Sequence, residues 1–96
     1  MMADSPTTFF AANSVVTQKG KQFSPRVLDI KVGDTVTFRN NDKHRHNVYS
    51  RTSGHKFRIK KQKPGQSNDV TFDTPGEIKV RCAMHPKVKM VVNVTN

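Results

Sequence analysis

The feature that most constrains the fold is a regular alternation of apolar and polar residues in short runs. Leu28, Ile30 and Val32 alternate with polar side chains, and the same two-residue period returns in residues 35–40 and 88–95. This period places the apolar side chains on one face of a half-buried strand. Gly, Pro, Asn and Asp separate the runs, as is typical of turns between strands. No helical period of useful length occurs, so the chain is predicted to be all-β.

We expect seven to eight short strands. The predicted strands cover residues 8–17, 27–32, 35–40, 46–50, 70–72, 78–82 and 88–95, whereas residues 51–66 form the least regular stretch. Strands of this number in 96 residues favour a two-sheet Greek-key β-sandwich. Residues 1–96 are expected to form a single domain, in which residues 1–6 are a disordered tail or the remnant of an added start.

The charge of the chain is strongly positive and unevenly spread. Lys and Arg number 17 against 7 Asp and Glu, which gives a formal net charge of +10. The stretch from Lys43 to Lys63 contains no acidic residue and eight basic ones: Lys43, Arg45, Arg51, Lys56, Arg58, Lys60, Lys61 and Lys63. Such a field predicts an acidic protein, a nucleic acid or an anionic membrane surface as partner. The alternative is a solvated basic face without a dedicated partner.

The sequence predicts no membrane span. No stretch approaches the roughly 20 consecutive apolar residues that a spanning helix needs. The first six residues lack the apolar core of a signal peptide. Contact with an anionic membrane surface through the basic residues remains compatible with this composition.

The single cysteine stands in a pattern of metal-ligating residues. Cys82 is followed by His85 and Met90, and a second imidazole, His46, lies upstream. One cysteine excludes an internal disulfide, and a lone buried thiol is commonly inert. Two His, one Cys and a weak Met, however, are the ligand set of a blue-copper electron-transfer site. This prediction depends on whether the four residues converge in the fold.

The order of several short motifs resembles the cupredoxin family, of the plastocyanin and amicyanin type. The motifs are Phe23-Ser24-Pro25, the Gly-Asp-x-Val-x-Phe-x-Asn strand within residues 32–40, His46-Asn47-Val48, Thr74-Pro75-Gly76, and Cys82-x-x-His85. Each motif alone is weak, but together they appear in the family's order with compatible spacing. The resemblance implies that the early His and the late ligands meet at one end of the sandwich.

The resemblance also implies a cofactor and a function. It implies one mononuclear copper ion and a small electron-transfer protein that cycles between Cu(II) and Cu(I), without enzymatic activity. A periplasmic copper carrier, store or sensor that uses the same site is the alternative. Cys82 and His85 as a thiol-nucleophile pair are less consistent with the sequence, because no third orienting group is indicated. The resemblance further implies a periplasmic or otherwise exported protein, and we expect a monomer.

The axial ligand is left open between two alternatives. The spacing Cys-x2-His-x4-Met matches plastocyanin-like loops and predicts Met90 as the axial ligand. A shorter loop in amicyanin-like relatives would place the axial position at Val88, which cannot bind a metal. Met90 would then belong to the core. Asn47 is expected to tie the strand of the first ligand to the cysteine loop, as the corresponding Asn does in relatives.

The remaining expectations concern partners and the other histidines. An acidic redox partner is expected to dock on the basic residues from Lys43 to Lys63 and at the His85 end, where Met84 and Pro86 would surround the imidazole. No nucleic acid is expected, because the few aromatic residues occupy apparent core positions and form no evident stacking platform. His44 and His55 are expected to be solvated loop residues.

Overall fold

The computed structural model describes residues 13–20, 22–83 and 85–96, apart from the side chains of residues 85–87. The expected tail 1–6, the first part of the strand predicted for residues 8–17, and Met84 therefore lie outside the described residues. Within the described part the chain is all-β, as predicted. The single-domain organisation of the whole chain stays a prediction.

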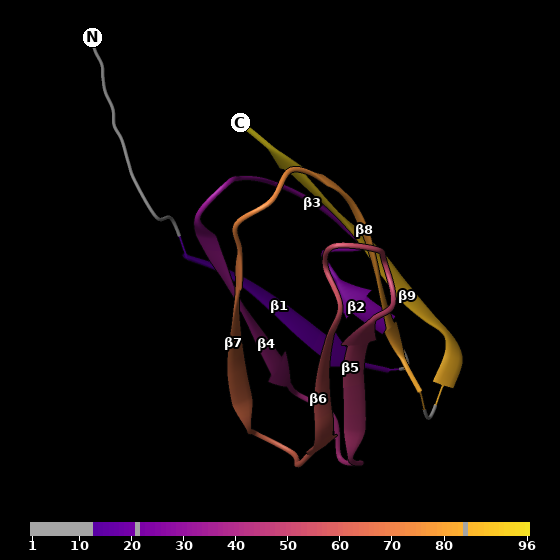
Figure 1. Ribbon diagram of the computed structural model, residues 1–96. Coiled ribbons are helices and arrows are strands. Elements are labelled where there is room, and N and C mark those ends of the chain that lie inside the picture. The colour runs from indigo at the N-terminus through magenta and orange to yellow at the C-terminus, as the bar shows by residue number, and fades with distance from the viewer. Residues whose placement is uncertain (1–12, 21, 84) are drawn as a thin grey trace, which may run out of the picture.

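Nine strands form the described structure (Figure 1). They are β1 (Asn13–Lys19), β2 (Gln22–Ser24), β3 (Val27–Lys31), β4 (Asp34–Asn40), β5 (His46–Ser50), β6 (Phe57–Gln62), β7 (Ser67–Phe72), β8 (Gly76–Cys82) and β9 (His85–Thr95). The count exceeds the seven to eight that the sequence predicts, because β2 and β6 were not expected. β2 is only three residues long, and β6 lies in the stretch that lacks a clear apolar pattern.

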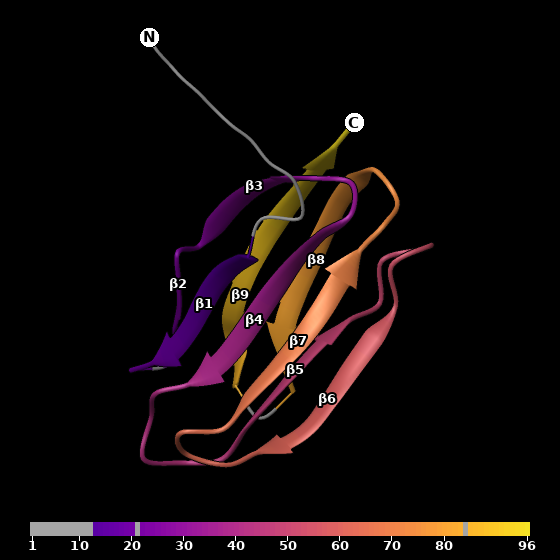
Figure 2. The ribbon, with the colours of Figure 1, turned by 90° about the vertical axis from the view of Figure 1, so that its left-hand side faces the viewer.

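The strands form two packed sheets, which confirms the predicted β-sandwich. One sheet has the order β2-β1-β4-β7 and the other the order β3-β9-β8-β5-β6. Figure 2 shows the two layers, with β1, β4 and β7 in front of β9 and β8. Two pairs are parallel, β1 with β4 and β3 with β9, so strands distant in sequence lie side by side.

The core fills the space between the sheets with the inward side chains of alternating positions. The four-stranded sheet contributes Val36 and Phe38, and the five-stranded sheet contributes Ile78, Val80 and Val92, all essentially inaccessible to solvent. Burial of this apolar surface is the main stabilising term for a domain of this size. The alternation continues to the strand ends, so the inward positions at one end of the sandwich are occupied by candidate metal ligands.

Three connections meet at that end of the sandwich. They join β4 to β5, β6 to β7 and β8 to β9, and they lie at the bottom of the molecule in Figure 1. β5 begins there with His46, and β8 ends there with Cys82. The topology therefore brings together two residues that are 36 positions apart in sequence.

Candidate metal centre

His46 and Cys82 face each other inside the sandwich. Each is an inward residue at the end of its strand, and neither side chain is accessible to solvent. The Nδ1 atom of His46 lies 3.7 Å from the Sγ atom of Cys82. The predicted convergence of the early imidazole with the late cysteine is therefore present in the fold.

The separation of these two atoms fits two ligands of one metal ion. Metal–sulfur and metal–nitrogen bonds of about 2.3 and about 2.0 Å, meeting at about 110–120°, place the two donor atoms roughly 3.5–3.8 Å apart. The observed 3.7 Å falls within this range. A soft thiolate beside an imidazole is a donor set that copper and zinc prefer over magnesium or calcium. The residues present thus fit a transition metal.

A carboxylate fixes which nitrogen of His46 faces the sulfur. The Nε2 atom of His46 donates a hydrogen bond of 3.0 Å to Oδ2 of Asp42. An ionised carboxylate only accepts hydrogen bonds, so the imidazole proton is held on Nε2. The lone pair then remains on Nδ1, which points to Cys82. Carboxylates that hold a ligating His in this way orient the ring and raise its basicity.

The environment of Asp42 keeps its carboxylate ionised. The hydrogen bond from His46 is the largest cause of a lowered pKa of Asp42, and the backbone N–H of Lys43 lowers this pKa further. That N–H donates to Oδ1 at 2.8 Å, so both carboxylate oxygens accept a hydrogen bond. The Asp42 side chain is 17 % exposed.

Asn40 holds the loop that carries Asp42. This side chain is fully buried at the end of β4, and its Nδ2 donates to the carbonyls of His44 at 2.7 Å and Gln62 at 2.8 Å. Its Oδ1 accepts the backbone N–H of Asp42 at 2.8 Å. One amide thus ties the β4–β5 loop to the end of β6. The position of Asp42 next to the imidazole of His46 is fixed by this loop rather than by the strands.

His85 is described only through its backbone. It is the first residue of β9, and its Cα pairs with that of Cys82 across the β8–β9 connection. Its side chain and that of Pro86 lie outside the described residues, as does Met84. Among the described side chains, no group of three His, Cys, Asp or Glu is placed to hold a metal ion. The ligand role of His85 accordingly stays a prediction.

Met90 and Val88 are both inward residues of β9 and belong to the buried core, each 2 % exposed. The Cα of Met90 pairs with that of Val80, two residues before Cys82 in β8. Two strand residues span about 6.6 Å, so the backbone of Met90 lies one inward position deeper than the cysteine. This placement favours the core alternative for Met90, and its axial role stays a prediction.

The other sequence candidates lie in different surroundings. His44 is exposed, as expected, whereas His55 is half-buried and its Nε2 lies 2.8 Å from the carbonyl of Thr74. Asn47 is half-buried, and its expected link to the cysteine loop stays a prediction. Tyr49 is half-buried and lies among the outward positions of β5.

Asp42 is the site residue that the sequence analysis missed. Its only signal was an acidic residue four positions before a candidate histidine ligand, in the turn Asn41-Asp42-Lys43. That spacing is uninformative in a loop, because the direction of each side chain there depends on the backbone turn. The contact needs the buried amide of Asn40 to set the turn.

Comparison with known proteins relates this arrangement to copper sites. A family model described as copper binding proteins, plastocyanin/azurin family, matches residues 11–95. A Cu(I) mutant of amicyanin is 29% identical with a TM-score of 0.77, and the match covers 84% of this chain and 80% of that chain. A purple cupredoxin from Nitrosopumilus maritimus is 28% identical with a TM-score of 0.77, over 85% of this chain and 99% of that chain.

A larger copper protein contains a similar domain. The copper-containing nitrite reductase (NirK) from Thermus scotoductus SA-01 is 28% identical with a TM-score of 0.83, and the match covers 99% of this chain but 25% of that chain. No curated protein sequence matches the chain. Among the residues that the structure describes, no helix is long and apolar enough to cross a membrane.

Proposed function

Because the chain belongs to the plastocyanin/azurin family of copper-binding proteins, we propose that it is a small blue-copper electron carrier with His46, Cys82 and His85 as its strong ligands. The observation that carries the proposal is the 3.7 Å separation of His46 Nδ1 and Cys82 Sγ inside the sandwich. The amicyanin and purple cupredoxin neighbours support the same class of site. His85 enters through its spacing from Cys82 in the sequence.

The residues of the chain prepare the site in three ways. Cys82 binds as a thiolate, because only the deprotonated sulfur is a metal ligand. Asp42 holds the proton of His46 on Nε2, so the lone pair of the imidazole lies on Nδ1, the atom that would bind the metal. The sandwich keeps both donors buried and fixed, so little rearrangement accompanies a change of charge at the site. Copper, when bound, supplies the Cu(II)/Cu(I) couple.

The proposal does not depend on a weak axial ligand. Its candidate by spacing, Met90, lies in the core opposite Val80. We therefore propose a site with three strong ligands, in which Met90 contributes mainly by packing. A site without a thioether favours Cu(I), which tolerates low coordination, and this raises the reduction potential.

The remaining parts of the proposal follow from the electron-carrier function. The protein carries electrons for an acidic redox partner and performs no substrate chemistry of its own. It acts as a single-domain monomer in the periplasm or another exported compartment. The nitrite reductase match covers a quarter of that enzyme, so it supports the domain rather than the enzyme's activity.

The burial of the ligands favours electron transfer over copper delivery. A carrier, store or sensor must expose its ligands to a receiving protein or to free copper, whereas His46 and Cys82 are both inaccessible to solvent. An electron can reach a buried metal without any ligand exchange. Because of this burial, periplasmic copper handling at the same site ranks second, after electron transfer.

Voltammetry and a transfer assay distinguish the two functions. The copper-loaded protein should show a reversible one-electron wave and should retain Cu(I) in the presence of a competing chelator. His85→Gln should abolish the reversible wave if His85 is a ligand, whereas His44→Gln should leave it unchanged because His44 is an exposed loop residue. An irreversible wave together with rapid loss of Cu(I) to the chelator would favour copper handling.

A further inference from the structure

Four residues that pair directly across neighbouring strands form a row on the outer face of the five-stranded sheet. Tyr49 of β5 pairs with Arg58 of β6 on one side and with Arg81 of β8 on the other. Arg81 in turn pairs with Lys89 of β9. Directly paired residues project from the same face, and strands are about 4.8 Å apart, so the row spans about 14 Å. The three cations of the row are exposed.

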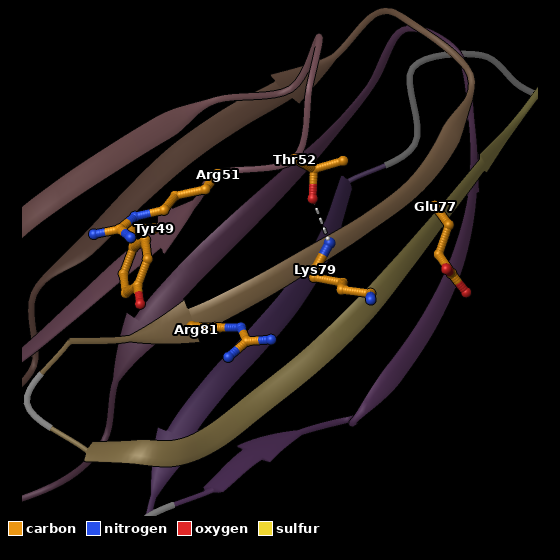
Figure 3. Close-up of a pocket in the computed structure, with 6 residues that line it drawn as sticks. All are labelled: Tyr49, Arg51, Thr52, Glu77, Lys79 and Arg81. Carbon is orange, nitrogen blue, oxygen red and sulfur yellow. Dashed lines mark hydrogen bonds between the residues drawn. The ribbon is translucent and has the colours of Figure 1, made fainter.

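Two further cations enlarge the row to a surface. Lys79 lies two residues before Arg81 and therefore projects from the same face of β8. The guanidinium of Arg51 lies 5.6 Å from the centre of the Tyr49 ring. Figure 3 shows Tyr49 and Arg51 beside Lys79 and Arg81. We name this surface the Tyr49 face and define it by Tyr49, Arg51, Arg58, Lys79, Arg81 and Lys89.

Tyr49 and Arg51 line two open hollows in this surface. The first, of about 450 Å³, is lined by Tyr49, Arg51, Thr52, Glu77, Lys79 and Arg81. The second, of about 520 Å³, is lined by Tyr49, Ser50, Arg51, Lys56, Phe57, Arg58 and Ala83. Glu77 is the one acidic residue among the described residues that line the two hollows. A tyrosine flanked by arginines is a composition typical of the centre of protein interfaces.

The five cations of the Tyr49 face form no ion pair with a carboxylate within the described part of the chain, although Glu77 lines one of its hollows. Arg81 and Lys89 are directly paired like charges, an arrangement that costs stability. The outer face of the other sheet differs, because hydroxyls of Thr35 and Thr37 bond to Thr71 and Asp69 there.

The Tyr49 face also lies directly behind the candidate metal centre. Arg81 is the covalent neighbour of Cys82, and successive side chains of a strand point to opposite faces of the sheet. Consecutive Cα atoms are 3.8 Å apart. A partner that contacts Arg81 is therefore one residue away from the ligand sulfur.

We propose that an acidic protein docks on the Tyr49 face and exchanges one electron with the metal site through it. The proposal rests on the electron-carrier function above, and no bond is formed or broken in the exchange. Carboxylates of the partner would bind the arginines in bidentate pairs and relieve the repulsion between Arg81 and Lys89. The docking site thus includes cations of β8 and β9, which the basic stretch from Lys43 to Lys63 does not contain.

A redox-inert anion locates the docking site without a known partner. Hexacyanochromate(III), a paramagnetic trianion, is titrated into the isotope-labelled, metal-free full chain, and the broadening of amide NMR signals is recorded. The proposal predicts the strongest broadening at Tyr49, Arg58, Arg81 and Lys89. Broadening centred on residues 40–46 and on His85 would place the anion at the metal end and overturn the proposal.

Two charge-reversal variants test whether the face governs electron exchange. Lys79→Glu/Arg81→Glu alters the Tyr49 face, and Lys19→Glu/Arg39→Glu makes the same change in net charge on the other sheet. Oxidation of each Cu(I) protein by hexacyanoferrate(III) is measured at low ionic strength. The face variant should react about tenfold more slowly than the control variant, because it loses local steering. Equal rates for the two variants would overturn the proposal.

Controls separate this proposal from the function on which it rests. Each variant should keep the visible band and potential of the unaltered protein, and Lys79→Gln/Arg81→Gln replaces the face variant if that variant does not. If the chain shows no blue-copper band, the electron-carrier function fails, and the NMR titration still tests docking. Polyglutamate should shift the amides of the Tyr49 face more than oligothymidylate of equal charge. The reverse order would assign the face to nucleic acid and overturn the protein partner.

Discussion

The Nε2 atom of His46 donates a hydrogen bond of 3.0 Å to Oδ2 of Asp42, and this contact decides which nitrogen faces Cys82. A ligating His whose second nitrogen is held in this way is restrained in both tautomer and ring orientation. The pair therefore forms part of the site although Asp42 does not contact the sulfur. It also supplies the most specific mutational test of the metal centre.

Asp42→Ala should weaken copper binding while the fold is retained. Loss of such a partner typically costs about 10–100-fold in metal affinity, because the imidazole loses its fixed orientation. Copper affinity is measured by competition with a chelator of known affinity. Asp69→Ala is the control, since it removes an equal charge from the other sheet, where Asp69 accepts a hydrogen bond from Thr37. Equal affinities of the two variants would contradict the role of Asp42.

The lowered pKa of Asp42 predicts an acid-dependent part of the stability of the metal-free protein. The hydrogen bond from His46 and the N–H of Lys43 hold this pKa below the ordinary value of 3.8. The unfolded chain then binds the proton more readily, so the stabilising contribution is complete above the ordinary pKa and is lost as pH falls through the folded pKa. The urea concentration at the midpoint of unfolding should decrease as pH falls through this acidic range. The decrease should be less steep in Asp42→Asn. Identical pH profiles for the two proteins would be inconsistent with the contact.

Met90→Leu should leave the visible band and the potential of the copper protein unchanged. Met90 packs in the core opposite Val80, and a change that conserves volume there costs less than about 1.5 kcal/mol. Val88→Met is the matched variant, because it introduces a thioether at the alternative axial position and should shift the band. A changed band or potential in Met90→Leu would show that Met90 is the axial ligand.

Lys89→Glu should stabilise the protein. It converts the directly paired like charges of Arg81 and Lys89 into an opposite pair, a change worth roughly 0.2–1 kcal/mol in the free energy of unfolding. Urea denaturation at low salt measures the gain, which should shrink as salt is added. Lys19→Glu serves as the control, because Lys19 pairs with the neutral Gln22. A gain no larger than that of the control would argue against repulsion in the row.

Much of the fold was predictable because the two-residue period is strong where a strand is half-buried. β6 escaped notice because Phe57 and Ile59 are only partly buried and alternate with basic residues, which resembles a solvated stretch. The meeting of His46 and Cys82 followed from the order of motifs. The contact of Asp42 did not, because it depends on a loop that a buried Asn40 sets. The Tyr49 face could not be predicted, because it combines residues of four strands.

The visible spectrum of the chain with one equivalent of Cu(II) tests most directly whether His46 and Cys82 bind the same ion. We predict a strong thiolate-to-copper band in the orange-to-red region, its loss in Cys82→Ser, and a strongly altered band in His46→Gln. Absence of the band in the unaltered protein, or its persistence in Cys82→Ser, would contradict the account.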